Sequence, residues 1–78
     1  MSVEFLTGDD TWMPIVGASA QAVFPNSYQV TFSIAPAWSR HVALLEAMTF
    51  RVEGRICSKA YVQFSDGSGS LTMMMLVS

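Results

Sequence analysis

The side chains that could do chemistry in this chain are few and lie far apart in the sequence. His41 is the only histidine, and so the only obvious general base near neutral pH. A nucleophilic site would need a serine or cysteine in a shared motif, yet the sequence has no G-x-S-x-G and no second histidine. A lone histidine beside Arg40 is typical of a surface turn. The sequence therefore predicts no catalytic residues and a protein that is not an enzyme.

Cys57 is the only cysteine, and it lies between Arg55 and Lys59. Those two cations could lower the pKa of the thiol and make it reactive. Because no base stands near it in the sequence, a partly buried structural thiol is the favoured interpretation. A single cysteine excludes an intrachain disulfide, and no cluster of Cys and His is present to hold structural zinc.

Carboxylates occur in two turn-like segments, Asp9 and Asp10 in "GDD" and Asp66 in "SDGSGS". Together they thinly resemble a calcium site, but the ligand spacing of an EF-hand loop is absent. Asp and Gly in these segments are explained by turn conformations alone. "SDGSGS" is also not a phosphate-binding loop, because no Lys-Ser or Lys-Thr pair follows it. We therefore predict no metal and no cofactor, and the sequence indicates no small-molecule substrate.

Charge and hydropathy exclude two classes of partner. The net charge is −2 with only four Lys and Arg, whereas nucleic-acid binding needs a clustered basic surface. The longest apolar run near the end, residues 73–77, is far shorter than the ~20 residues that span a bilayer. The small residues at 17–22 follow acidic residues rather than the basic start of a signal peptide. We expect a soluble protein that binds neither nucleic acid nor membrane.

The first half of the chain predicts short antiparallel strands. Residues 28–35 alternate apolar and polar side chains with period two, and residues 20–24 form a plausible partner across the turn "FPNS". Residues 3–7 are also strand-like. Residues 12–17 contain Pro14, which limits them to an edge strand or an extended arm.

The second half repeats the alternation on either side of Gly54. Residues directly opposite in a hairpin share a face of the sheet. A three-residue loop, 53–55, would therefore pair Val52 with Ile56 and keep one face entirely apolar. A single long strand bulged at Gly54 is the alternative. Either arrangement places the apolar residues on the core face and Cys57 on the polar one; the apolar set is Ile56, Ala60, Val62 and Phe64.

Residues 39–48 leave two structures open. Ser39 could N-cap a short helix near 39–47, or the segment could begin the following strand. Taken together, the pattern predicts one all-β domain over residues 1–78, a small antiparallel β-sandwich or flattened barrel of about five to seven strands. Residues 1–17 would be an edge strand or an arm.

The C-terminal strand, "SLTMMMLV", has apolar residues on both faces. Leu71, Met73 and Met75 share a face with Val77, while the opposite face carries Met74 and Leu76. A strand apolar on both faces is stable only where both are covered, and a chain of 78 residues has little material for that. Either Met74 and Leu76 lie under a loop, or they contact another subunit.

The composition of the chain favours a contact of Met74 and Leu76 with another subunit. Hydrophobic residues make up 51% of the chain and charged residues 13%, against about 25% charged residues in ordinary soluble domains. Trp12 and Trp38, each beside a proline, could also anchor a partner if they are exposed, or cover the core or an edge of the sheet if they are buried. We predict an interface made by these residues of the C-terminal strand and the two tryptophans: Leu71, Met73, Met74, Met75, Leu76, Trp12 and Trp38.

These features lead to two functional hypotheses. The first is a non-enzymatic structural subunit that forms a homo-oligomer or docks on a larger protein assembly. In its low charge and its richness in Ser, Ala and aromatic residues, the chain resembles small accessory proteins of virions, such as capsid decoration or tail subunits. The second is a small protein-binding module, for example a phage-encoded inhibitor of a host macromolecular machine.

Overall fold

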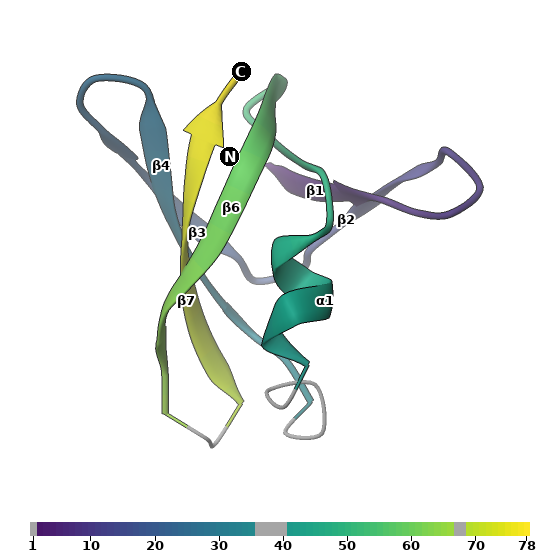
Figure 1. Cartoon of the computed structure of the whole chain (residues 1–78), viewed down its shortest axis with the longest axis vertical. Helices are drawn as coiled ribbons and strands as arrows, with labels where there is room; N and C mark the ends of the chain where they lie inside the picture. The colour runs from purple at the N-terminus through teal and green to yellow at the C-terminus, as the bar shows by residue number, and fades with distance from the viewer. Residues whose placement is uncertain (1, 36–40, 67–68) are drawn as a thin grey trace.

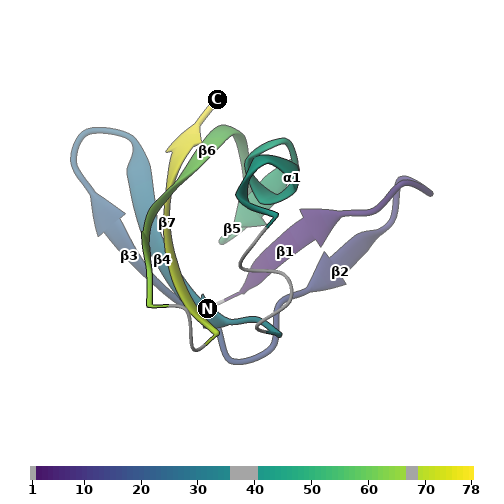
Figure 2. The same ribbon diagram turned by 60° about the horizontal axis from the view of Figure 1, so that its bottom comes forward.

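The computed structural model describes residues 2–35, 41–66 and 69–78. Its strands form one antiparallel sheet of seven strands in the order β2-β1-β5-β6-β7-β4-β3 (Figure 1). The sheet curls into a half-barrel, which is nearer to the predicted barrel than to a sandwich of two sheets (Figure 2). The elements are β1 Val3–Leu6, β2 Trp12–Pro14, β3 Ser19–Val23, β4 Ser27–Ser33, α1 Val42–Glu46, β5 Phe50–Val52, β6 Arg55–Ser65 and β7 Ser70–Val77.

The core lies on the concave side of the curled sheet, where α1 also packs (Figure 2). Alternate residues of each strand point to this side, as the period-two pattern requires. Leu45 joins them from the helix. The buried set is Val3, Tyr28, Val30, Phe32, Leu45, Phe50, Val52, Cys57, Ala60, Leu71, Met73 and Met75.

The edge strand predicted in the N-terminal segment is confirmed for β2, whereas β1 lies inside the sheet. β1 pairs with β5 on one side and with β2 on the other, and Pro14 lies in β2 at the end of the sheet. The predicted hairpin of residues 20–35 is also present as β3 and β4.

A short helix forms near residues 39–47, so the helical alternative is confirmed. It begins at Val42, with His41 as the N-cap residue and no side-chain cap hydrogen bond. The predicted N-cap, Ser39, lies outside the described residues. Glu46 Oε2 accepts a hydrogen bond of 2.8 Å from the backbone N–H of Val62, which attaches the end of the helix to β6.

The predicted three-residue loop between β5 and β6 is wrong. Val52 pairs with Arg55, so the loop is the two residues Glu53 and Gly54. Both have positive φ, +52° and +79°, as in a type I′ turn, whose twist matches that of the flanking strands. The Tyr28 hydroxyl donates a 3.2 Å hydrogen bond to Glu53 Oε2, which holds this unusual position for a glutamate.

This turn reverses the predicted faces at the start of β6. Cys57 was expected on the polar face but has no exposed surface, whereas Ile56 was expected in the core and is 50% exposed. An irregularity between Cys57 and Lys59 then returns Ala60 to the core side. A second one, between Val62 and Phe64, turns Phe64 outward, where it is 58% exposed. Bulges of this kind shift the alternation by one residue, which no simple period-two pattern includes.

Candidate interaction surface

The apolar C-terminal strand lies in the middle of the sheet, between β6 and β4. Leu71, Met73 and Met75 point into the core and have no exposed surface. Met74 and Leu76 point to the convex side and are half-buried. Of the residues predicted for an interface on this strand, these two therefore present surface to a neighbour.

Apolar side chains from β6 extend this surface. Tyr61 is directly opposite Met74 in the sheet and is 47% exposed. Leu76 is opposite Lys59, and the outward-turned Ile56 and Phe64 lie farther along β6 in either direction. We call the five residues Ile56, Tyr61, Phe64, Met74 and Leu76 the convex patch.

Hydrogen-bonded polar side chains cross the convex patch from β4 to β6. Gln29 Nε2 donates a 3.2 Å hydrogen bond to Gln63 Oε1, spanning β7 from β4 to β6. The hydroxyls of Thr31 and Thr72 are 3.1 Å apart and share a hydrogen bond. Polar side chains therefore lie between the apolar ones, and a contact made here would combine apolar burial with hydrogen bonds, as protein–protein interfaces do.

Sequence reasoning missed three members of the patch: Ile56, Tyr61 and Phe64. Tyr61 was detectable, because it alternates with Ala60 and Val62 and so belongs on the face opposite the core. Ile56 and Phe64 carried no usable signal, since their orientation depends on the type I′ turn and on a bulge.

Trp12 lies on the convex side but away from the patch, because β1, β5 and β6 separate β2 from β7. The guanidinium of Arg51 lies 4.3 Å from the centroid of the Trp12 ring. Arg51 Nε also donates a 2.9 Å hydrogen bond to Glu4 Oε1. That hydrogen bond holds the pKa of Glu4 below its ordinary value, against the opposing effect of burial. Trp12 is therefore half-covered within its own chain, and Trp38 lies outside the described residues.

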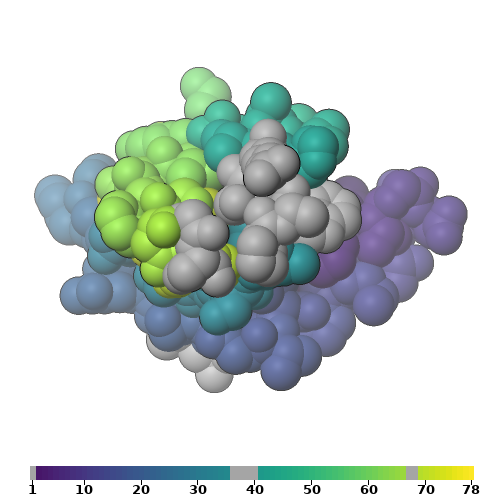
Figure 3. Space-filling view, turned by 90° about the horizontal axis from the view of Figure 1, so that it is seen from below, coloured from purple at the N-terminus to yellow at the C-terminus, as the bar shows by residue number. Residues whose placement is uncertain are grey.

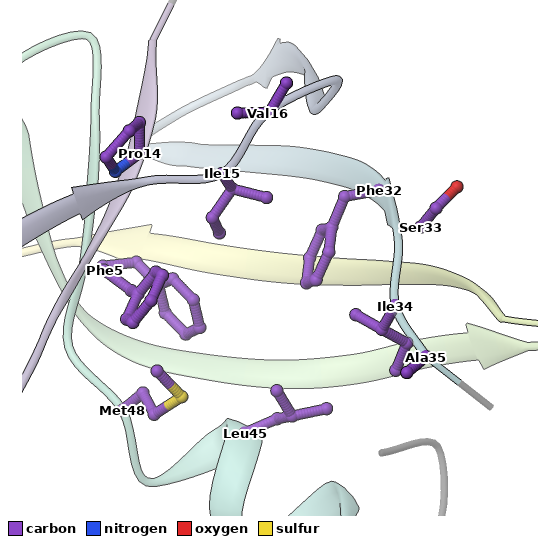
Figure 4. Close-up of a pocket in the computed structure, with 11 residues that line it drawn as sticks. Phe5, Pro14, Ile15, Val16, Phe32, Ser33, Ile34, Ala35, Leu45 and Met48 are labelled. Carbon is purple, nitrogen blue, oxygen red and sulfur yellow. The ribbon is translucent and has the colours of Figure 1, made fainter. Parts of the chain in front are cut away.

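An apolar hollow opens on the concave side, at the end of the half-barrel near α1 (Figure 4). Its volume is about 370 Å³. The side chains in Figure 4 come from the N-terminal segment, the end of β4 and the helix region, and most of them point inward. The lining residues are Phe5, Pro14, Ile15, Val16, Phe32, Ser33, Ile34, Ala35, Leu45, Met48 and Phe50. Among the described lining residues Ser33 has the only polar side chain, so these residues offer no set of groups for acid–base chemistry.

The polar residues considered for chemistry do not converge on a site. His41 is exposed at the start of α1, while Cys57 is buried in the sheet. Burial raises the pKa of the Cys57 thiol, which opposes the reactive thiolate form. Within residues 2–35, 41–66 and 69–78, no three His, Cys, Asp or Glu side chains are grouped to hold a metal ion.

No helix among the described residues is long and apolar enough to cross a membrane. Comparison of the chain with protein-family models, curated proteins and solved structures gave no match. The surfaces described above are therefore interpreted from their own geometry.

Proposed function

We propose that this protein is a non-enzymatic structural subunit that self-associates or docks on a larger protein assembly, and that the convex patch is the surface that contacts this larger assembly. The observation that carries the proposal is the position of exposed apolar side chains in the middle of the sheet rather than at its margin. Tyr61, Phe64 and Ile56 are each about half exposed, beside the half-buried Met74 and Leu76.

The low net stability of a small domain favours burial of the convex patch in an assembly. A domain of this size has a net stability of only several kcal/mol, on the order of 0.05–0.15 kcal/mol per residue. Covering apolar surface contributes about 25 cal/mol per Å², so burying several patch side chains adds a few kcal/mol per subunit. Aromatic and methionine side chains are also enriched at interfaces, because they give large contact areas and adapt to irregular surfaces.

The finer proposal is an accessory subunit of a virion, such as a capsid decoration or tail protein. It is supported by the low charge of the chain together with the convex patch, since such subunits are largely covered by neighbours. Native mass spectrometry of material from the natural source tests it directly. Recovery of the chain in a particle of defined stoichiometry is expected, and recovery as a free monomer would contradict it.

The patch itself is tested by the double variant Tyr61→Asp, Phe64→Asp. Both side chains are exposed, so the fold is retained while charge enters the proposed contact. Met74→Asp with Leu76→Asp should also abolish assembly, although these half-buried residues of a central strand contribute to stability as well.

The matched control is Met13→Asp, Leu44→Asp, which adds the same charge at exposed apolar residues outside the patch. Assembly is measured by native mass spectrometry or by co-purification from the source. Loss with the patch variant and retention with the control are expected. Equal assembly by both variants would show that the patch faces water.

A further inference from the structure

The free edge of β3 carries none of the features that normally block strand pairing. β3 is the last strand on one side of the sheet, and Figure 2 shows it at the end opposite β2. Its five residues, Ser19–Val23, include no charge and no proline, and their register with β4 is uninterrupted. In an antiparallel ladder, alternate residues of an edge strand direct N–H and C=O groups away from the sheet. Among the described residues β3 pairs with no strand other than β4, so its outer edge presents backbone N–H and C=O groups for further pairing.

The opposite edge is protected in the usual ways. β2 has only three residues, and Pro14 among them lacks a backbone N–H. One edge of the sheet is thus closed to further pairing and the other is open. Of the two edge strands, β3 is therefore the one available to pair with a partner.

Two apolar side chains are almost fully exposed to solvent, one just before β3 in the sequence and one just after it. Val16 precedes the strand and is 90% exposed; Phe24 follows it and is 95% exposed. They are the most exposed large hydrophobic residues of the described chain. The β3–β4 hairpin, which carries Phe24, projects from the side of the molecule opposite the β1–β2 hairpin (Figure 3).

We propose that β3 pairs in antiparallel fashion with β3 of a second copy of this chain, giving a two-fold symmetric dimer with a continuous sheet. The register that uses all five residues of β3 places Gln21 opposite Gln21 of the second copy. Ser19 is then opposite Val23, and Ala20 opposite Ala22. Residues opposite one another share a face in both copies, so the two cores remain on the same side of the sheet.

Self-pairing fits the side chains at the edge better than pairing with a charged or bulky strand. The Gln21 amide both donates and accepts hydrogen bonds, so two copies complement each other across the symmetry axis. Gln21 is directly opposite Gln29, which already bonds to Gln63, so the contact would extend an existing row of amides. The small Ala20 and Ala22 present no bulk on the concave side.

The same register brings both exposed apolar residues to the dimer contact. Val16 lies in the turn before β3 and Phe24 in the turn after it, so antiparallel pairing sets the Phe24 turn of one copy beside the Val16 turn of the other. Symmetry repeats this contact at the other end of the strand. Because each β3 edge is used by the other, association stops at two copies instead of continuing into a fibre.

The dimer uses a different surface from the convex patch and does not depend on the proposed function. It is tested by sedimentation equilibrium with Gln21→Lys, Gln21→Glu and an equimolar mixture of the two. Gln21 is exposed, so both variants should keep the fold, which circular dichroism checks. The wild-type chain is expected at twice its 8.5 kDa mass. Each variant alone is expected as a monomer, because like charges meet at the axis, and the mixture is expected to regain the dimer.

Tyr61→Lys, on the convex patch, is the matched control and should remain dimeric. A monomeric wild-type chain at high micromolar concentration would overturn the proposal. So would a dimer that survives both Gln21 variants, or one that is lost with Tyr61→Lys and kept with Gln21→Lys. That last result would assign self-association to the convex patch instead.

A second measurement tests the register. Phe24→Ser should raise the dimer dissociation constant at least about tenfold, because a largely buried aromatic contact is lost. Phe64→Ser, an equivalent change at an exposed residue of the convex patch, should leave that constant unchanged. Equal dissociation constants for the two variants would contradict the placement of Phe24 against the second copy.

Discussion

Glu46 Oε2 lies 2.8 Å from the backbone nitrogen of Val62, at the point where β6 departs from regular pairing with β7. β5 pairs with β6 only at Arg55–Cys57, and farther along β6 the carboxylate at the end of α1 accepts the hydrogen bond from this N–H. A short helix with no side-chain cap has little stability of its own. The Glu46–Val62 hydrogen bond therefore attaches the helix to β6 and stabilises it there.

Replacing Glu46 should destabilise the fold in a graded way. Glu46→Ala leaves the N–H of Val62 unpaired and should cost about 1–3 kcal/mol, while Glu46→Gln retains an acceptor and should cost less. Urea denaturation gives both values. Asp9→Ala, at an exposed carboxylate in the β1–β2 turn, is the control and should change stability little. A Glu46→Ala variant as stable as this control would show that water satisfies the N–H equally well.

Acid should remove the contribution of the Glu4–Arg51 pair. The hydrogen bond from Arg51 holds the pKa of Glu4 below its ordinary value of 4.5. A carboxylate with a lowered pKa in the folded state stabilises the fold above its unfolded pKa, and this stabilisation is lost as pH falls through the folded value.

The variant Glu4→Gln isolates that effect. It should be less stable than wild type at neutral pH, and the difference should shrink as pH falls from 4.5 through the lowered pKa of Glu4, where the carboxylate of the wild type becomes protonated. Thermal unfolding across this pH range measures the difference. A gap that stays constant with pH would mean that Glu4 contributes through packing alone.

The buried Cys57 thiol should be protected from reagents in the folded protein. Burial raises its pKa above the ordinary value of 9.0, and the side chain has no exposed surface. Reaction with a thiol reagent should therefore require unfolding and should accelerate with added denaturant.

Moving the thiol by one residue supplies the control. The double variant Ile56→Cys, Cys57→Ala places it on the convex side, at a residue that is half exposed in the wild-type chain. This thiol should react without denaturant. Equal native rates for wild type and variant would contradict the orientation of the strand at this point.

The sequence predicted most strands, the edge position of Pro14 and the hairpin of residues 20–35, because each rests on a local pattern. The helix at Val42–Glu46 was one of two open alternatives, decided in the fold by Leu45 entering the core and Glu46 bonding to β6. Two of the five residues of the convex patch were predicted. The outward orientation of Met74 and Leu76 follows from alternation within one strand. Ile56 and Phe64 point outward because of the register of β6 with its neighbouring strands, which alternation alone does not predict.

The β5–β6 turn determines which residues of β6 begin on the core side, so its geometry can be tested by substitution. Gly54 has φ +79° in open space, with no atom within 4 Å of an added Cβ. Gly54→Ala should therefore cost about 1–2 kcal/mol through backbone strain alone. Gly8 is equally open but has no positive φ, so Gly8→Ala should be neutral or stabilising by about 0.5 kcal/mol. Urea midpoints with unchanged slopes measure both. If the two alanine variants were equally stable, the type I′ turn would be wrong, and with it the register that buries Cys57 and exposes Ile56.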